Sequence, residues 1–286
     1  MSLFENCEQS SLQHYVIQNH KKQDMVRTGS YNTTNNMSHC NSWMVVADGH
    51  GVGNVINVLN TLDWDDTMNN DEPIEYVKTL INSMEQTIRD GSTISIVKIS
   101  NIGIRMWWIG DSQIRVYKNN EELWRSNNHN GENLKELQKT REKNLETELA
   151  WELSVLDNEH ITLKPSNYVY HIVDGQKEKL ALTRSLGHNG DVCQETETHF
   201  IPFDNKGKWK IIAASDGFWG MTCLYDDGFL KDNDYGAEEL CKIASQRWSK
   251  KWYYVDPRDK DNTKIVKQEI QGPHGDIGVT VWSGNM

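Results

Sequence analysis

Residues 42–54, SWMVVADGHGVGN, join an apolar run to a carboxylate, an imidazole and several glycines. The run from Trp43 to Ala47 is typical of a buried strand. An Asp-Gly pair is enough to make a turn, so Asp48 and Gly49 alone indicate only the end of that strand. His50, directly after them, is either a polar loop residue or a catalyst, and the rest of the sequence has to decide between the two.

The pairing of an apolar run with an acid recurs along the chain. It occurs as VVAD (45–48), WWIGD (107–111) and IIAASD (211–216), and Asp276 directly precedes IGVTVW. Strand pairing can bring all four acids to one rim, where they repel each other unless a cation neutralises them. Ligands that are all oxygen favour Mg²⁺ or Mn²⁺ over zinc. The pattern leaves two alternatives open, a metal-dependent hydrolase and a set of ordinary turns.

Composition indicates an ordinary globular protein. The 286 residues are 25% charged and 37% apolar, and the formal net charge is −11. An acidic balance supplies no basic footprint for nucleic acid, so we expect no nucleic-acid partner. It suits a protein that gathers cations, although solubility explains it equally well.

Several features favour a cytoplasmic protein without a membrane segment. No run approaches the about 18 apolar residues that cross a bilayer. The start of the chain, MSLFENCEQSSLQHY, lacks the basic beginning and apolar centre of a signal peptide. The five cysteines are scattered and form no CxxC pair, which is typical of reduced thiols.

Periodicity predicts an α+β layered sandwich. Apolar residues at helical spacing predict helices over 73–90 and 236–252. Alternation and turn residues predict strands over 92–99, 102–110, 113–119, 167–173, 208–215 and 277–283. The charged segment 127–152 is expected to be a solvated helix with loops. Helices that frame hairpin-linked strands favour layered sheets and helices.

The motifs together resemble those of the type-2C, metal-dependent serine/threonine protein phosphatases. Asp48-Gly49-His50-Gly51 matches the DGHG signature of that family. The other similar segments, in family order, are KKQDM (21–25), IGDSQIRVY (109–117), LALTRSLG (180–187), IIAASDGFWGM (211–221) and GDIGVTVW (275–282). They extend over nearly the whole chain, and their order makes the resemblance specific.

The resemblance implies a fold and an activity. The fold is a four-layer sandwich of two antiparallel sheets flanked by helices, formed by residues 1–286 as a single phosphatase domain. Residues 127–165 correspond to a variable flap beside the active site, where substrate choice is expected. The activity is hydrolysis of phosphoserine and phosphothreonine in phosphorylated proteins by a water that two Mg²⁺ or Mn²⁺ ions activate. We expect a monomer.

The resemblance also assigns roles to single residues. Asp48 matches the acid that bridges two metal ions, and the carbonyl of Gly49 matches a backbone ligand. The acids that match further ligands are Asp24, Asp216 and Asp276, together with Asp111 at a weaker third metal site. His50 matches the histidine proposed to protonate the leaving oxygen, so His50 and Asp48 are the expected catalytic residues.

The chain departs from the family pattern around the phosphate. The usual phosphate-binding arginine has no clear match in QNHKKQD, where Lys21 or Lys22 could supply a point charge without the bidentate fork of arginine. Gln23 stands where many members carry Glu. The missing arginine, together with the altered acids of the third metal site, motivates an alternative function, a catalytically weak relative that binds a phosphoprotein as a regulator.

Further departures lie in the later motifs. Gly220 replaces the acid that partners Asp111 at the third metal site, and His188 replaces the acid after LG. Ile277 stands where Asn usually follows the last acid. The acids of the two-metal site are all present, and a binding module has no chemical need for them.

Overall fold

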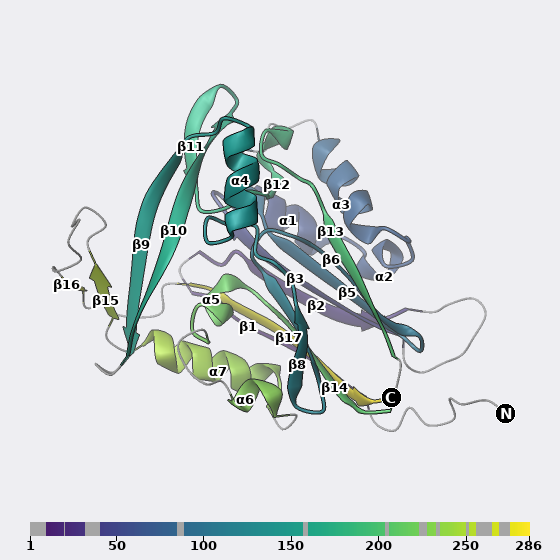
Figure 1. Ribbon diagram of the computed structural model, residues 1–286. Helices are drawn as coiled ribbons and strands as arrows, with labels where there is room; N and C mark the ends of the chain where they lie inside the picture. Colours follow the sequence, from purple (N-terminus) through teal and green to yellow (C-terminus); the bar gives the residue numbers. More distant parts are fainter. Residues whose placement is uncertain are drawn as a thin grey trace.

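The structure is a computed structural model of the chain. It describes residues 10–19, 21–31, 41–84, 89–156, 160–203, 206–222, 228–232, 235–249, 252–255, 265–268 and 275–286. Two large antiparallel sheets dominate it (Figure 1).

The first large sheet has five strands and combines both ends of the described chain with its middle. In spatial order its strands are β1 (Ser11–Ile17), β17 (Ile277–Asn285), β14 (Lys208–Ala214), β7 (Gln113–Lys118) and β8 (Glu121–Arg125). Every pairing in it is antiparallel. Asp216 and Asp276, far apart in the sequence, therefore lie beside neighbouring strands.

The second large sheet has seven strands and contains the segment with which the sequence analysis began. Its strands are β2 (Asp24–Ser30), β3 (Ser42–His50), β4 (Gly91–Ser92), β5 (Ile94–Ser100), β6 (Gly103–Ile109), β12 (Leu186–Gly187) and β13 (Glu197–Pro202). β3 is central, because β2, β4 and β5 all pair with it.

Alternation along β3 separates two hydrophobic cores. Successive side chains of a strand point to opposite faces. Val45 and Ala47 are buried in the core that lies beneath the helices of this sheet. Met44 and Val46 are buried in the core between the two sheets. The even-numbered residues of this strand therefore face the interior of the sandwich.

Helices cover the outer face of each sheet and complete four layers (Figure 1). On the seven-stranded sheet these are α1 (Asn54–Thr61), α2 (Trp64–Thr67) and α3 (Pro73–Asn82). On the five-stranded sheet they are α5 (Asp216–Trp219), α6 (Gly228–Lys231) and α7 (Ala237–Trp248). The predicted α+β sandwich of two antiparallel sheets flanked by helices is confirmed.

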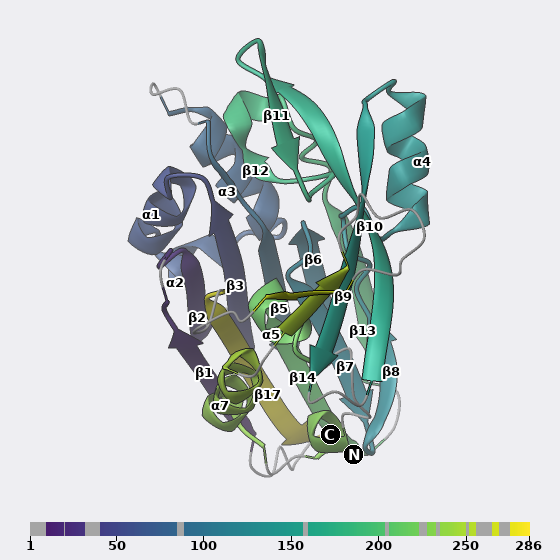
Figure 2. The ribbon, with the colours of Figure 1, turned by 90° about the vertical axis from the view of Figure 1, so that its left-hand side faces the viewer.

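The remaining elements stand outside the four layers. A three-stranded sheet of β9 (Thr147–Leu156), β10 (His160–Val173) and β11 (Gln176–Leu180) rises near α4 (Leu134–Glu142), as Figure 2 shows. The short helix η1 (His188–Gly190) follows β12. β15 (Trp252–Val255) pairs with β16 (Ile265–Gln268).

Most predicted elements are present, with three corrections. The helix predicted over 73–90 ends at Asn82, and Arg89 and Asp90 are not helical; residues 85–88 lie outside the described ranges. The end of this segment has other partners, because the Asp90 carboxylate accepts a hydrogen bond from the amide of Asn54. The helix expected within 127–152 is confined to α4, and Thr147 already begins β9.

The third correction concerns Asp48. The sequence places it at the tip of a strand, but β3 continues to His50. The added residues have partners, since Gly49 and His50 pair with Ser92 and Gly91 of β4. Asp48 is therefore held inside a sheet rather than in a turn.

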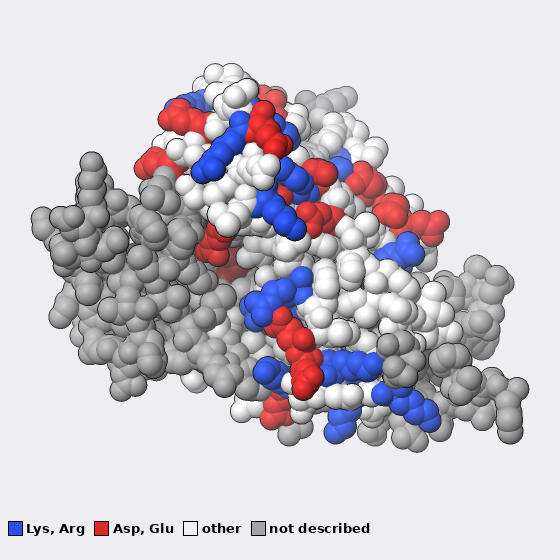
Figure 3. Space-filling model, in the orientation of Figure 1, with Lys and Arg blue, Asp and Glu red and all other residues white. Residues whose placement is uncertain are grey.

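Exposed ion pairs are spread over the surface, and charges of both signs are interspersed on the face drawn in Figure 3. One exposed pair joins Arg125 Nε to Glu122 Oε1 at 2.5 Å. Such pairs typically contribute less than about 1 kcal/mol.

Within the described ranges, none of the helices has both the length and the apolar character needed to cross a bilayer.

Candidate active site

At one end of the layer between the two sheets, acids take the place of the apolar side chains. Asp48 follows Met44 and Val46 on the inward face of β3, and Asp24 is its direct partner on β2. Asp24 is only 3% exposed, and its Oδ2 accepts a hydrogen bond from Ser215 Oγ at 2.6 Å. The apolar layer between the sheets thus gives way to two carboxylates at one end.

The five-stranded sheet brings two more acids to the same end. Asp216 is the first residue of α5, directly after β14, and its side chain is exposed in the cleft. Asp276 immediately precedes β17 and is buried. Its two oxygens accept hydrogen bonds from the amides of Asn19 and Gln23, at 2.6 and 2.7 Å. These amides hold the Asp276 carboxylate in a fixed orientation.

Asp111 lies in the turn between β6 and β7, on the opposite wall. Its Oδ2 accepts a hydrogen bond from the side-chain amide of Asn130 at 3.3 Å. Gly220, at the end of α5, lines the same cleft, so the structure brings these two positions into one site. Gly220 has φ of −56°, a conformation open to any residue.

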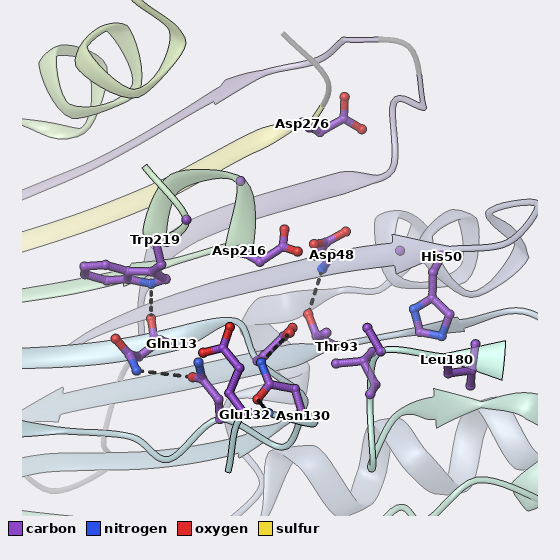
Figure 4. Close-up of a pocket in the computed structure, with 18 of the residues that line it drawn as sticks. Asp48, His50, Thr93, Gln113, Asn130, Glu132, Leu180, Asp216, Trp219 and Asp276 are labelled. Carbon is purple, nitrogen blue, oxygen red and sulfur yellow. Dashed lines mark hydrogen bonds between the residues drawn. The ribbon is translucent and has the colours of Figure 1, made fainter. Parts of the chain in front are cut away.

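Four of these acids line a cleft with a volume of about 650 Å³, namely Asp48, Asp111, Asp216 and Asp276. Asp24 is buried beside Asp48 and is not among the lining residues. Figure 4 shows Asp216 and Asp48 pointing toward each other, with Asp276 above them and His50 to one side. Lys21 lines the cleft, whereas Lys22, with φ of 53°, is not among the lining residues. Residues 179–182, at the end of β11 and beyond, form part of the wall. Gly49 also lines the cleft, beside Asp48.

The acids of the cleft have unusual electrostatics. Burial, Asp216 and Asp276 raise the pKa of Asp24 to about 7, against the effect of its hydrogen bond with Ser215. Burial and then Asp216 raise the pKa of Asp111 to about 8. Burial, followed by Asp216 and Asp24, places the pKa of Asp48 well above its usual range. The causes are the same in each case, removal from water and the charge of neighbouring carboxylates.

The donor set fits divalent cations. Asp24 Oδ1 is buried and has no hydrogen-bond partner within the described part of the chain. The carboxyl groups of Asp48 and Asp216 are close enough to share a proton. Neighbouring carboxylates with no basic side chain between them are stable near neutral pH only with a proton or a cation. All-oxygen ligands of this kind suit Mg²⁺ or Mn²⁺.

A second group of acids lies apart from these, beneath α4. Ligand atoms of His129, Glu136 and Glu197 lie within 4.8 Å of one another, a spacing that could hold a metal ion. The guanidinium of Arg184 already supplies a positive charge to these acids. It donates to both oxygens of Glu136, at 2.8 and 2.6 Å, and to Glu197 at 3.2 Å. This group is therefore a buried ion-pair network with its own cation.

His50 lies at the end of β3, where its ring contacts another imidazole. Its Nε2 is 2.7 Å from Nε2 of His188, and the two rings stack with centroids 4.9 Å apart. Burial, then His188 and Lys21, lower the pKa of His50 to about 3. His50 is thus neutral near pH 7 in the free cleft.

Sequence reasoning missed several residues that hold the acids in place. Thr93 Oγ1 accepts a hydrogen bond from the amide of Asp48 at 3.1 Å and lies 2.6 Å from Ser112 Oγ. Ser215 and Asn130, which bond to Asp24 and Asp111, were also missed. Ser215 lies within the motif IIAASD, so its position beside Asp216 was a usable signal. Thr93 and Asn130 carry no such signal, because their partners are distant in the sequence.

Comparisons with known proteins show which solved structures have a similar fold. No family model matches the sequence, and no curated protein matches it either. Solved structures do match. A sex-determining protein of C. elegans superposes with a TM-score of 0.56 at 16% identity, over 97% of this chain and 64% of that one. The chain therefore spans less than two thirds of that protein.

Two phosphatases also match over nearly their whole length. The serine-threonine phosphatase 2C of Toxoplasma gondii has a TM-score of 0.55 at 10% identity, over 97% of this chain and 94% of that one. The catalytic domain of the serine/threonine protein phosphatase PstP, solved in complex with two manganese ions, has a TM-score of 0.53 at 14% identity, over 96% and 98%. The chain shares the fold of the type-2C serine/threonine phosphatases.

Proposed function

We propose that this protein is a Mg²⁺- or Mn²⁺-dependent phosphatase that hydrolyses phosphoserine and phosphothreonine in proteins. One observation carries the proposal. Asp48 and Asp216 line one cleft, Asp24 is buried beside Asp48 on the neighbouring strand, and burial and mutual repulsion raise the pKa values of Asp24 and Asp48. Carboxylates whose ionised form is disfavoured by burial and by one another are typical of a functional site. A bound cation would favour the ionised form again. The shared fold with phosphatases, one of them solved with two manganese ions, supports the same conclusion.

Several acids would together hold two cations. The ligands would be Asp48, Asp216 and Asp276 with the carbonyl of Gly49, and Asp24 would contribute its charge beside them. When bound, such a pair lowers the pKa of a water molecule and orients the phosphoryl group for in-line attack. The hydrogen bonds from Ser215, Asn19 and Gln23 keep the carboxylates oriented. Asp111, with Asn130 beside it, would hold a further cation only weakly, since Gly220 adds no charge.

Lys21 and His50 would act on the substrate itself. Lys21 is exposed and lines the cleft, so its ammonium group can reach a phosphate there. His50 lines the same cleft and would give a proton to the departing serine or threonine oxygen. Lys21→Ala should raise KM for a phosphopeptide by about tenfold, the loss of one charge-assisted hydrogen bond. Lys22→Ala should raise it less.

A second candidate function is a phosphoprotein-binding regulator with weak catalysis. The lowered pKa of His50 favours it, because a histidine that is neutral near pH 7 is a poor general acid. Lysine in place of a bidentate arginine also weakens the grip on phosphate. Such a protein would bind a phosphopeptide in the presence of Mn²⁺ without turning it over.

The deciding experiment is hydrolysis of a phosphoserine peptide and of p-nitrophenyl phosphate with Mn²⁺, with Ca²⁺ and with excess chelator. We expect turnover with Mn²⁺, its loss in chelator, its recovery when Mn²⁺ is added back, and no support by Ca²⁺, which is larger and activates water less. Undiminished hydrolysis in chelator would rule out the mechanism. Binding of the phosphopeptide without turnover would favour the regulator.

A further inference from the structure

His188, whose ring contacts His50, is held in place by several contacts of its own. His188 is 1% exposed and belongs to η1, directly after β12. Its amide donates to the carbonyl of Asp90 at 3.0 Å, and its Nδ1 lies 2.6 Å from the carbonyl of Arg89. Both nitrogens of its ring are engaged, one with the backbone and one with His50.

These contacts assign the protons on both rings. A carbonyl oxygen only accepts, so His188 carries its proton on Nδ1 and offers the lone pair of Nε2. The proton between the two rings is then on Nε2 of His50. Ser185 Oγ, 3.3 Å from the same nitrogen, is consistent with this assignment, because its own hydrogen is directed to the carbonyl of Leu186 at 2.9 Å.

The second ring nitrogen of His50, Nδ1, remains available to a molecule in the cleft. Within the described part of the chain, Nδ1 of His50 has no hydrogen-bond partner, and the residue lines the cleft. Its Nε2 points instead to His188 and Ser185, both almost fully buried. The ring therefore presents Nδ1 to a substrate and Nε2 to the protein.

Gly91 shows that the backbone is built around this pair. A Cβ atom at Gly91 would lie 2.3 Å from Nε2 of His188 and 2.6 Å from Nε2 of His50. Both distances are far below van der Waals contact, and both atoms are those that make the hydrogen bond. Any side chain at residue 91 would therefore push the two imidazoles apart.

We propose that His188 is a positioning residue for His50. It accepts the Nε2 proton of His50 and so fixes both the orientation of the ring and its tautomer, with Nδ1 as the nitrogen that meets the leaving oxygen. The inference deepens the proposed phosphatase function and rests on it for its kinetic consequence, whereas the tautomer itself can be measured without any reaction.

The role in the reaction follows from the position of the protons. Nδ1 of the neutral ring carries no proton, so His50 first takes one from solvent on Nδ1 and becomes an imidazolium. As the bond between phosphorus and the serine oxygen breaks, that oxygen takes this proton from Nδ1. Water supplies the oxygen of the new bond to phosphorus and releases a proton to solvent. The ring that remains is the neutral tautomer with hydrogen on Nε2, the form that His188 holds. An oriented acceptor behind a catalytic histidine can affect turnover strongly, because the wrong tautomer is inactive.

The first test measures the tautomer. In protein labelled with ¹⁵N in histidine, the ring nitrogens of His50 are assigned by comparison with His50→Gln. In the wild type we expect a protonated Nε2 and an unprotonated Nδ1 near neutral pH. In His188→Ala the two tautomers of His50 should mix. A wild-type His50 with its proton on Nδ1, or an unchanged tautomer in His188→Ala, would overturn the proposal.

The second test uses the leaving group. p-Nitrophenolate departs as a stable anion, whereas a serine alkoxide needs a proton. His188→Ala should therefore lose about tenfold more turnover on a phosphoserine peptide than on p-nitrophenyl phosphate, part of what general acid catalysis supplies. His188→Asp should recover the peptide turnover, because its carboxylate can accept from His50 and Asp tolerates the φ of 51° at this position. Equal losses on both substrates would contradict a positioning role.

A matched control separates this role from backbone strain. Asn189, the next residue, has φ of 50°, so Asn189→Ala carries the same strain without touching His50. It should leave the ratio of the two turnover rates unchanged. If the wild type hydrolyses neither substrate with Mn²⁺, the proposed function fails, and the tautomer measurement still decides the role of His188.

Discussion

Two groups of acids in this molecule have opposite electrostatics. Beside the cleft, burial and neighbouring carboxylates raise the pKa of Asp24 to about 7. Beneath α4, the contact with His129, whose Nε2 is 3.4 Å from Glu197 Oε1, lowers the pKa of Glu197 to about 2. The pKa of Glu136 is also lowered, because contact with Arg184 outweighs the effect of burial. The difference is that the guanidinium of Arg184 donates to both oxygens of Glu136, whereas no ion pair joins a basic side chain to Asp24, Asp48 or Asp216 among the residues that the structure describes.

That difference distinguishes acids that stabilise the fold from acids that are available to bind a ligand. An acid buried for structural reasons is paired, because an unpaired buried charge costs several kcal/mol. Arg184 is the ion-pair partner of Glu136 and Glu197, and within the described ranges no ion pair reaches Asp24, Asp48 or Asp216. Acids without a counter-charge among the described residues are available to an external cation. Spacing alone would favour the other group, since among the described residues only the group beneath α4 has its ligand atoms within 4.8 Å of one another.

The largest expected effect comes from removing one charge in the cleft. Asp216→Asn keeps the shape of the side chain and removes the charge of a proposed metal ligand. Turnover at matched Mn²⁺ should fall by more than about a hundredfold, since even an outer-shell partner of a ligand can be that important. Glu121→Gln, the same kind of change on the exposed part of β8, should retain wild-type turnover. A folded Asp216→Asn protein with wild-type turnover would remove Asp216 from the site.

Removing the cation of the other group should affect stability instead. Arg184→Met removes the guanidinium from Glu136, which among the described residues keeps only Thr183 Oγ1 at 3.0 Å and Lys139 Nζ at 3.6 Å, and the free energy of unfolding should fall by about 3–5 kcal/mol. Adding Glu136→Gln should recover part of the loss, because the buried charge that lost its guanidinium is gone. Urea unfolding of the three proteins measures this. If Mn²⁺ stabilises Arg184→Met more than the wild type, the group beneath α4 binds cations after all.

A smaller effect is expected at Asp111, which lacks the partner acid of the family. Asp111→Asn should reduce turnover less than Asp216→Asn does. Gly220→Asp should raise activity at high Mg²⁺ or Mn²⁺, because the backbone there allows any residue, although its Cβ would lie 3.0 Å from the carbonyl of Asp216. Gly220→Asn is the matched control without the charge. An Asp111→Asn protein as inactive as Asp216→Asn would make Asp111 a working ligand.

The smallest effect is a pH dependence of stability. The pKa of Asp24 in the folded protein, about 7, is above its ordinary value of 3.8. Its contribution to the stability of the metal-free protein is therefore fully present below pH 3.8 and lost as pH rises through 7. Mn²⁺ reverses that loss, so it should raise Tm more at about pH 8 than at about pH 5. A gain in Tm that is equal at both pH values would show that the acids of the cleft do not bind the ion.

Local patterns in the sequence predicted much of the site. Asp111, Asp216 and Asp276 each stand at the boundary of an apolar strand, and sheet pairing brings such boundaries together. The helix predicted over 236–252, which in the structure is Ala237–Trp248, and the principal strands were predictable for the same reason, because their apolar periodicity is local.

Long-range contacts were not predictable in this way. Arg184 and Glu136 are 48 residues apart, and nothing in either segment indicates their ion pair. The contact between His50 and His188 spans 138 residues. The sequence showed His188 only as a departure from a family pattern. The early end of the helix at Asn82 also depends on distant partners, since Asp90 and Arg89 bond to Asn54 and His188.

The most direct test of the central claim is to count bound Mn²⁺ by electron paramagnetic resonance at neutral pH, in the wild type, in Asp216→Asn and in Arg184→Met. We predict two ions per chain in the wild type. Asp216→Asn should lose at least one of them, and folded Arg184→Met should keep both. Absence of bound Mn²⁺ in the wild type, or a count that falls in Arg184→Met and stays unchanged in Asp216→Asn, would contradict the assignment of the cleft acids as the metal site.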